Sequence, residues 1–512
     1  MRADCVFSSF MTETHFDVLI VGAGLSGIGA AWHLQKKCPG KSYAILEGRE
    51  AIGGTWDLFR YPGIRSDSDM HTLGYIFKPW KERKAIADGP SILKYVRETA
   101  EQNGIDQHIR FNHLVKRSSW DSNTATWSVE AEDAKTGEMH RLTCDFLYMC
   151  SGYYSYEGGH RPDFPNEEAF AGKIVHPQEW PEDLDYSGKK VVVIGSGATA
   201  VTLVPEMANE AEHVTMLQRS PTYVVSRPAE DALANRLRKV LPESWAYGAT
   251  RWRNILFQMF FFNMARKRPE KVKERILGMA QEELGPEFDV ETHFTPSYNP
   301  WDQRLCLVPD SDLFKSLKEG SASVETDHIE HFDETGIQLK SGKHLDADVI
   351  VTATGLKLVF LGGMEIVVDG SVIDPSEIHG YRGVMFENIP NLVSTFGYTN
   401  ASWTLKADLT ADFVTRLLKY MDRKAYAEVR PEAGEPIGDE PWLDFSSGYV
   451  TRAMEHFPKQ GDRMPWRLHQ NYVKDIFALR HAKFEDGVLV FRSRQTGGVD
   501  VDDPASAAVA AE

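Results

Sequence analysis

Two glycine-rich segments of the sequence could each hold the pyrophosphate of a dinucleotide. In the first, GAGLSG, the glycines are Gly22, Gly24 and Gly27. In this pattern the first glycine makes a tight turn, the second lets the backbone approach the phosphates, and the third lets helix and strand pack closely. Amide groups at the start of the following helix then donate to the phosphates. The second segment, GSGATA, ends in alanine, a common variant, and its expected binding residues are Gly195, Gly197, Ala198, Thr199 and Ala200.

A charged residue after the second strand of each unit indicates which dinucleotide binds there. Glu47 lies 20 residues beyond Gly27, where its carboxylate can accept from both ribose hydroxyls and would repel a 2′-phosphate. This first site favours FAD or NAD over NADP, and we predict FAD. Arg219, followed by Ser220, occupies the corresponding place in the second unit. A guanidinium there can pair bidentately with a 2′-phosphate, which predicts NADPH; an exposed arginine without a role is the alternative.

The elements around both segments must place these glycines between a strand and a helix. Residues 16–21 are predicted to form a strand, 28–37 a helix and 42–46 a second strand. The same arrangement returns with strands at 190–194 and 213–217. Two copies in one chain predict two nucleotide-binding domains.

The length of the chain supports the same division. A chain of 512 residues is too long for one hydrophobic core, because single cores stop growing beyond roughly 250–300 residues. We predict an α/β fold with two Rossmann-like dinucleotide-binding domains, for FAD and NADPH, and a helical insertion in the second. The predicted parts are a disordered leader at 1–13, an FAD-binding domain at 14–152 and 381–495, an interdomain linker at 153–189, an NADPH-binding domain at 190–228 and 300–380, the helical insertion at 229–299 and a disordered tail at 496–512.

Charge and cysteine content argue against several classes of protein. The net charge of −17 and the pI near 5.5 argue against nucleic-acid binding, because phosphates require a basic surface. The five cysteines are odd in number and form no C-x-x-C pair, so we expect no disulfide framework, no metal site and no redox dithiol. These features favour a cytoplasmic protein.

The sequence predicts no transmembrane segment. No apolar run approaches the 18 or so residues that a span needs, and residues 1–10 lack the pattern of a signal peptide. Ile255–Phe262 is strongly apolar and lies between arginine and lysine residues. We interpret this segment as a buried helix, with peripheral membrane contact as the alternative.

The stretch before the second unit carries a more specific motif. Residues 170–181 read F-x-G-x-x-x-H-x-x-x-W-P, which resembles the fingerprint of type I Baeyer–Villiger monooxygenases, and residues 53–67 resemble that family's second signature without a departure. Related flavin-containing and N-hydroxylating monooxygenases usually have Tyr or Phe where this chain has the final Trp-Pro. A broader resemblance to bacterial FAD-containing members extends from about Phe16 to Arg494. The fingerprint positions are Phe170, Gly172, His176, Trp180 and Pro181.

The resemblance implies a defined reaction. NADPH reduces FAD, O2 adds at flavin C4a, and the peroxyflavin converts ketones to esters or lactones and sulfides to sulfoxides. The expected substrates are therefore a small-molecule ketone or sulfide and O2. The protein must stabilise a peroxide anion and exclude water, which would release H2O2 unproductively.

The resemblance also implies roles for individual residues. Arg304 matches the family's catalytic arginine, whose fixed positive charge suits a peroxide anion and the oxyanion of the adduct. Asp67 matches the carboxylate that holds this arginine near the flavin, and we expect it to contact FAD. Gln303 occupies a position where many relatives carry a lysine, so phosphate recognition would depend more on Arg219 and Ser220. Further expected FAD contacts are Gly54, Thr55 and Trp56.

Other assignments remain open at this point. The family pattern implies that His176 and Trp180 couple domain motion to NADPH binding, and a hydrogen-bonded core histidine is the alternative. We expect residues 257–262 and 398–403 to line the substrate pocket. Two other functions are a flavin N- or S-hydroxylating monooxygenase with little ketone activity, which the Trp-Pro pair disfavours, and a non-oxygenating reductase or redox-sensing protein, which the absent C-x-x-C disfavours.

Overall fold

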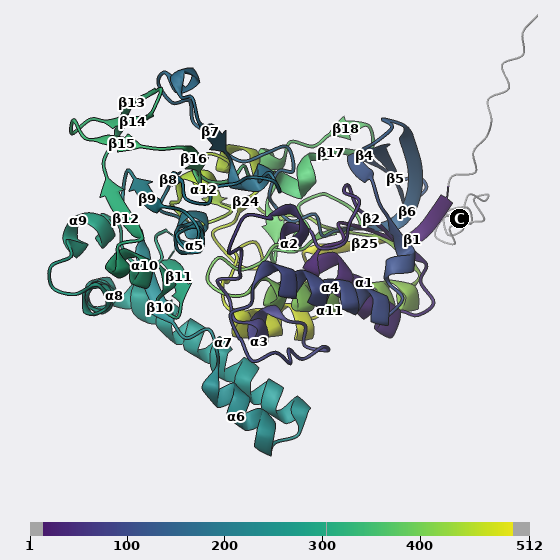
Figure 1. Ribbon diagram of the computed structural model, residues 1–512. Coiled ribbons are helices and arrows are strands. Elements are labelled where there is room, and N and C mark those ends of the chain that lie inside the picture. Colours follow the sequence, from purple (N-terminus) through teal and green to yellow (C-terminus); the bar gives the residue numbers. More distant parts are fainter. Residues whose placement is uncertain (1–13, 304, 495–512) are drawn as a thin grey trace, which may run out of the picture.

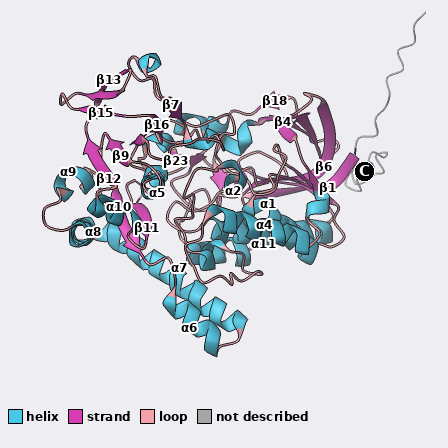
Figure 2. Cartoon of the chain, viewed as in Figure 1, coloured by secondary structure: helices cyan, strands magenta, loops and turns pink. Residues whose placement is uncertain are grey.

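The computed structural model describes residues 14–303 and 305–494, which form two α/β units (Figure 1). The predicted leader and tail lie outside the described residues, and so does Arg304. In the view of Figure 1 the first unit lies on the right and the second on the left. Helices pack on the sheets of both units (Figure 2), which confirms the predicted α/β fold with two Rossmann-like units.

A nine-stranded sheet forms the centre of the first unit, in the order β18-β17-β4-β5-β6-β1-β2-β3, with β21 also paired to β6. Strands β6, β1, β2 and β3 run parallel, as in a Rossmann half, whereas β4, β5 and β6 form an antiparallel meander. The strands are β1 Thr14–Val21, β2 Tyr43–Leu46, β3 Ile109–Arg110, β4 His113–Asp121, β5 Thr126–Asp133, β6 Met139–Met149, β17 Glu365–Val368, β18 Ser371–Val372 and β21 Leu392–Ser394.

The second unit has a sheet of five parallel strands in the order β12-β9-β8-β16-β7. The strands are β7 Lys173–Val175, β8 Lys190–Ile194, β9 His213–Gln218, β12 Ala322–Thr326 and β16 Val349–Thr352. Two smaller sheets lie in the segments that connect these strands. They are β10 Tyr223–Arg227 with β11 Leu305–Pro309, and β13 Ile329–Asp333 with β14 Gly336–Leu339 and β15 His344–Asp346.

Two predicted boundaries need correction. We expected residues 300–380 to belong to the second domain, but β17 pairs in parallel with β4 of the first sheet, so the chain has already returned by Glu365. We also expected 153–189 to be only a linker, whereas β7 within it forms the edge strand of the second sheet beside β16. Both errors concern short strands that are defined by their distant partners.

The remaining elements complete the two units and form two-stranded sheets after the first unit resumes. The helices are α1 Leu25–Lys37, α2 Thr55–Leu58, α3 Met70–Leu73, α4 Gly89–Gln102, α5 Ala198–Met207, α10 Asp312–Glu319, α11 Trp403–Lys424, α12 Gly448–Thr451 and α13 Tyr472–Asp475. The strand pairs are β19 Gly380–Tyr381 with β20 Met385–Phe386, β22 Tyr426–Pro431 with β25 Leu489–Ser493, and β23 Glu440–Pro441 with β24 Lys459–Gln460.

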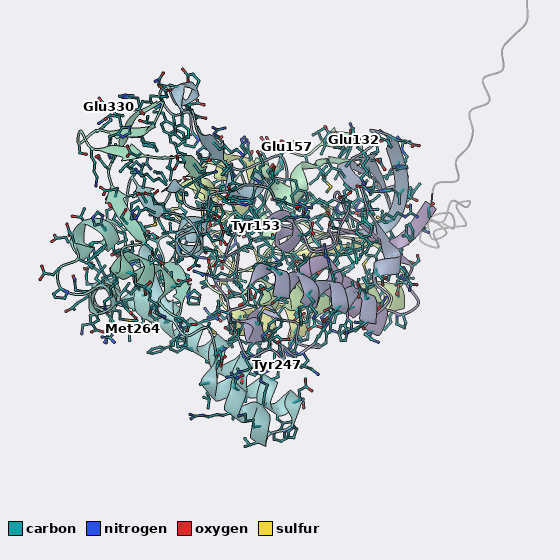
Figure 3. All side chains as sticks on the ribbon, in the orientation of Figure 1. Glu132, Tyr153, Glu157, Tyr247, Met264 and Glu330 are labelled. Atoms are coloured by element: carbon teal, nitrogen blue, oxygen red, sulfur yellow. The ribbon has the colours of Figure 1, made fainter. Side chains whose placement is uncertain are left out.

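The helical insertion comprises α6 Ala232–Val240, α7 Glu243–Lys267, α8 Pro269–Leu284 and α9 Val290–Phe294. In Figure 3, α7 runs from Tyr247, below the first unit, to Met264 beside the second. Helices α6 and α7 project beyond both units at the bottom of Figure 1. Residues 255–262 are therefore not the buried helix that we expected: Ile255 is buried, whereas Leu256, Phe257 and Phe260 are exposed. None of the described helices is long and apolar enough to cross a membrane.

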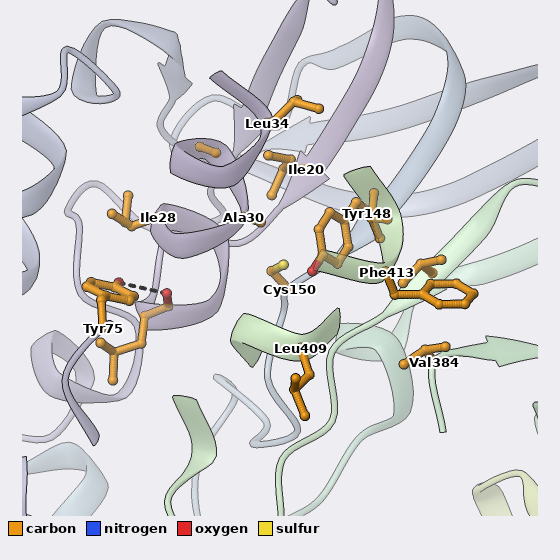
Figure 4. Packing of buried hydrophobic residues seen from close by; sticks show 14 of the residues in the cluster. Ile20, Ile28, Ala30, Leu34, Tyr75, Tyr148, Cys150, Val384, Leu409 and Phe413 are labelled. Carbon is orange, nitrogen blue, oxygen red and sulfur yellow. Dashed lines mark hydrogen bonds between the residues drawn. The ribbon is translucent and has the colours of Figure 1, made fainter. Parts of the chain in front are cut away.

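The largest core lies between the first sheet and two helices. Ile28, Ala30 and Leu34 on one face of α1 are buried with Leu409 and Phe413 of α11, and Figure 4 shows these side chains beside the sheet. The Tyr75 hydroxyl donates to the carbonyl oxygen of Leu25 at 2.7 Å, which fixes the start of α1. The dashed line at Tyr75 in Figure 4 marks a hydrogen bond of this residue. This packing holds the helix N-terminus, and with it the first glycine turn, rigidly against the sheet.

Candidate active site

The first glycine turn is enclosed by backbone. Gly22 has a φ of +104°, and a Cβ there would lie 2.5 Å from the carbonyl oxygen of Cys150. A Cβ on Gly27 would lie 1.8 Å from the carbonyl oxygen of Gly22. The first position needs the left-handed backbone, and the third needs close approach between helix and turn. The turn therefore delivers the N-terminus of α1, which starts at Leu25, to the edge of the cavity described below.

The carboxylate of Glu47 contacts the turn itself. Glu47 is 1% exposed, its Oε2 accepts from the Ala23 N–H at 2.7 Å, and its Oε1 accepts from the Arg49 N–H at 3.0 Å. Burial raises the pKa of this carboxyl, while the two amides and the Arg49 charge act in the opposite direction. Glu47 thus orients the glycine turn through Ala23.

The second turn is more open. Gly195 has a φ of +141°, and a Cβ there would lie 2.3 Å from the carbonyl oxygen of Ala353, but a Cβ on Gly197 would meet no atom within 4 Å. Arg219 and Ser220 follow β9 and are exposed. The Ser196 hydroxyl donates to the Ser220 carbonyl oxygen at 2.9 Å, which joins this loop to the turn.

Both turns open onto one cavity of about 1120 Å³. This volume exceeds the roughly 300–1000 Å³ of an ordinary small-molecule pocket. Residues on its wall include Gly22, Gly24, Ser26, Gly195, Ser196, Gly197, Ala198 and Thr199. A molecule bound at one turn can therefore approach a molecule bound at the other.

Most of the residues predicted from the two glycine segments and from the signature at 53–67 lie on this cavity. Asp67 lies on its wall, as do Arg219 and Ser220 at the second turn, and Gly54, Thr55 and Trp56 from the loop and first turn of α2. Arg304 lies outside the described residues, but its neighbours Gln303 and Leu305 both line the cavity. Among the predicted cofactor-binding residues, Gly27, Glu47 and Ala200 do not line it.

The five fingerprint positions pack elsewhere, and none of them lines the cavity. A Cβ on Gly172 would lie 2.4 Å from the carbonyl oxygen of Asp348, so this glycine lets β7 approach β16. His176 Nε2 is 3.3 Å from the Gly355 carbonyl oxygen, and its Nδ1 accepts from the Gln178 N–H at 3.2 Å. Burial lowers the pKa of His176, which fits the neutral ring that this geometry requires.

Trp180 and Phe170 pack in two different apolar clusters of the second unit. Gly355, which the His176 ring contacts, lies on the cavity wall with a φ of +109°. The fingerprint segment therefore supports the loop after β16 from behind. It also holds the segment at 153–160, because the Gln178 amide donates to the Ser155 carbonyl oxygen at 2.7 Å.

The predicted pocket segments both contribute to the wall. Phe257 and Phe261 come from α7, and Tyr398 and Trp403 come from the loop before α11 and its first residue. The Trp403 indole N–H donates to the Ser26 hydroxyl at 2.7 Å, so this wall is joined to the first glycine turn.

Several polar residues of the wall carry no motif and were not predicted. Lys340, which follows β14, lines the cavity that Arg219 also lines. It gives the cavity a second positive side chain, whereas position 303 carries the neutral Gln303. His160 and Arg452 also line it, and burial together with the Arg452 charge lowers the pKa of His160. Only the folding of distant loops brings these residues together. Within the described residues, no group of His, Cys, Asp or Glu is arranged to hold a metal.

Comparison with known proteins gives the family. Residues 86–420 match the flavin-binding monooxygenase-like family, and residues 20–81 match the NAD(P)-binding Rossmann-like domain. The chain is 54% identical over 486 residues to the FAD-containing monooxygenase EthA of Mycobacterium tuberculosis (strain ATCC 25618 / H37Rv). The aligned residues make up 94% of this chain and 99% of EthA. The resemblance to a bacterial FAD-containing monooxygenase is confirmed.

Solved structures share the fold at low sequence identity. An oxidized steroid monooxygenase bound to NADP has a TM-score of 0.72 at 22% identity, over 94% of this chain and 100% of that chain. Cyclohexanone monooxygenase from Rhodococcus sp. Phi1 bound to NADP+ has a TM-score of 0.71 at 20% identity, with the same coverage. The family match, the identity to EthA over nearly the full length and this shared fold agree: the chain belongs to the flavin-binding monooxygenase-like family.

Proposed function

We propose that this chain is an FAD- and NADPH-dependent monooxygenase that converts ketones to esters or lactones and sulfides to sulfoxides. In the ketone reaction, one atom of O2 enters between the carbonyl carbon and a neighbouring carbon, and the other atom leaves as water. NADPH supplies two electrons and, with one proton from solvent, balances the reaction. A flavin N- or S-hydroxylating enzyme with little ketone activity is the alternative.

The observation that carries the proposal is the shared cavity. Monooxygenation needs the electron donor, the flavin and the substrate to meet in one space from which water is excluded. The two glycine turns, 22–27 and 195–200, open onto one shared cavity, and aromatic residues of α7 and of the segment before α11 supply an apolar part of its wall. The Trp-Pro end of the fingerprint at 170–181 favours ketone oxidation over the alternative.

The residues at the first turn fit FAD. A Cβ on Gly24 would lie only 3.5 Å from the Gly54 Cα, so two side-chain-free segments face each other where a pyrophosphate can approach backbone N–H groups. We assign FAD to the first unit and NADPH to the second, where Arg219 and Ser220 would hold the 2′-phosphate. When bound, FAD supplies the redox chemistry that links NADPH to O2.

We assign the catalytic positive charge to Arg304 and its positioning to Asp67. The two residues beside Arg304 line the cavity, and so does Asp67, which supports this assignment. A fixed guanidinium stabilises negative oxygen species without any proton transfer, and a carboxylate nearby can hold its orientation.

Arg304→Ala tests the proposal. We expect normal FAD content and normal flavin reduction by NADPH, while ester formation falls by about 100-fold or more, because removing one preorganised group that stabilises an oxyanion costs roughly 10²–10³ in rate. The purified holoenzyme should be assayed with a cyclic ketone and a thioether side by side, and both products measured by mass. Ester formation by Arg304→Ala at the parent rate would contradict the role of Arg304, and sulfoxide without ester from the parent enzyme would favour the alternative.

A further inference from the structure

The exposed face of α7 carries an apolar stripe, in which the Trp252 ring also lies 6.0 Å from the Tyr472 ring of the first unit. Trp245, Trp252, Leu256 and Phe260 are between 44% and 73% exposed. Their spacing of seven, four and four residues places them on one side of the helix, in line with the exposed Ala249 between the two tryptophans. At 1.5 Å per residue the stripe is about 23 Å long. Leu233 and Val240 of the neighbouring α6 are exposed as well.

Such a stripe is unusual on a soluble surface. Single exposed apolar residues are common, but a contiguous row of large ones marks a contact with an apolar phase or a partner. The two tryptophans come first, and the row continues towards the exposed Lys267 at the end of the helix. Tryptophan is the residue that favours the boundary between lipid and water.

The charge of these helices is opposite to that of the whole chain. Residues 232–267 contain seven Lys or Arg residues and one Glu, a net charge of +6, whereas the whole chain carries −17. Arg251 and Arg253 are paired with Asp408 and Asp231, and the exposed basic residues include Arg236, Lys239 and Lys267. The stripe is therefore flanked by positive charge.

We propose that α6 and α7 form a peripheral docking surface for a bilayer that contains anionic lipid. Large apolar residues on one helical face, flanked by Lys and Arg, are the features that place a helix in the plane of a membrane interface. A second copy of this chain fits less well, because pairing two such surfaces face to face would bring the exposed Arg236, Lys239 and Lys267 of one copy against those of the other.

The proposed surface is held firmly and lies next to the cavity. The guanidinium of Arg251 donates to the carbonyl oxygens of His71 and Gly74, both at 2.8 Å, and Asn254 donates to Asp69 at 2.8 Å. One turn further on, Phe257 and Phe261 line the cavity, and the Arg227 guanidinium lies 4.6 Å from the centre of the Phe257 ring. Docking would therefore bring the α7 wall of the cavity close to the lipid.

Vesicle sedimentation tests the proposal on the full-length protein. The probes are vesicles of phosphatidylcholine alone and of phosphatidylcholine with an equal amount of phosphatidylglycerol. We expect the parent protein to pellet with the anionic vesicles, to bind at least tenfold more weakly to neutral ones, and to be released at high salt. The double variant Leu256→Ser, Phe260→Ser should bind the anionic vesicles at least tenfold more weakly than the parent.

The matched control removes two exposed apolar residues elsewhere. Met139 on β6 and Val372 on β18 are both exposed, and Met139→Ser with Val372→Ser should pellet as the parent does. Both double variants are first compared with the parent in melting temperature and FAD content, and Trp245→Ser provides a second stripe variant if the first is unstable. The proposal fails if the parent does not pellet with anionic vesicles, if stripe and control variants pellet alike, or if the stripe variant instead dissolves a dimer seen without lipid by sedimentation velocity.

Discussion

The two glycine turns share a sequence pattern and differ in how their surroundings enclose them. Around the first, backbone atoms lie within 4 Å of a Cβ at each of Gly22, Gly24 and Gly27, and the acid after β2 is buried. Around the second, the position of Gly197 is open and the arginine after β9 is exposed. The first turn is built into the protein core, and the second lies at its surface.

This difference matches the two proposed ligands. A flavin that remains bound through many turnovers suits a turn fixed by Glu47 and by the start of α1. A coenzyme that must enter as NADPH and leave as NADP+ suits an open turn, whose charged groups can release it. The four changes below begin with the largest expected effect, the loss of FAD, and end with the smallest; the first three test this contrast.

Gly22→Ala should have the largest effect. The left-handed backbone alone costs about 1–3 kcal/mol for a residue with a Cβ, and the contact with the Cys150 carbonyl oxygen adds to this. We expect FAD content, read from the flavin absorbance of the purified protein, to fall at least fivefold.

Gly197→Ala is the matched control at the second turn. Gly197 has a φ of −80° and open space around it, so we expect normal folding and FAD content with a KM for NADPH that rises by about fivefold as the methyl group holds the pyrophosphate away. Equal loss of FAD in both variants would remove the contrast.

Arg219→Ala should change only the binding of NADPH. A charge-assisted hydrogen bond contributes about 1.5–3 kcal/mol, so the KM for NADPH should rise by roughly tenfold or more. NADH lacks the 2′-phosphate, so its KM should not change. Steady-state kinetics with both coenzymes measure this, and an unchanged NADPH to NADH preference would mean that another cation, with Lys340 the first to examine, recognises the phosphate.

His176→Asn should have the smallest effect, and it depends on pH. Burial lowers the pKa of His176 in the folded protein, whereas the unfolded chain titrates near 6.5. The unfolded state therefore binds a proton first as the pH falls, so the stability contributed by the neutral ring is present above pH 6.5 and is lost as the pH falls through the folded-state pKa. The parent should lose melting temperature between pH 7.5 and 5.5.

In His176→Asn that loss should be smaller by about one degree. Some slope will remain, because burial also lowers the pKa values of His71, His160 and His293. A melting temperature that falls equally steeply in parent and variant would contradict the role given to the neutral imidazole.

Local patterns predicted the parts of the fold that depend on neighbours in sequence. Strand β8 was predicted with its observed bounds, and the second glycine turn and the start of α5 follow it directly. An apolar run next to a glycine-rich segment determines each of these elements, and such runs can be recognised in a single sequence. The cavity wall from the segment at 398–403 was also predicted, and Tyr398 and Trp403 line the cavity.

Features that depend on distant partners were missed. The places of β7 and β17 follow from pairing with β16 and β4, far away in sequence. Lys340 and Arg452 reach the cavity from loops with no motif, and the Ala23 amide as partner of Glu47 follows only from the packed turn. The exposure of α7 was missed as well, because an apolar run in the sequence does not show which face of the helix packs against the rest of the protein.

The attachment of α7 has a mechanical consequence. This helix follows the second unit in the chain, yet its buried Arg251 is held by Asp408 and by the carbonyl groups around α3, all of the first unit. The insertion therefore acts as a brace across the molecule. Helices α8 and α9 pack in the core of the second unit, so the insertion is attached to both units. If the second unit turns to admit or release its ligand, α7 must bend or the contacts of Arg251 must give way.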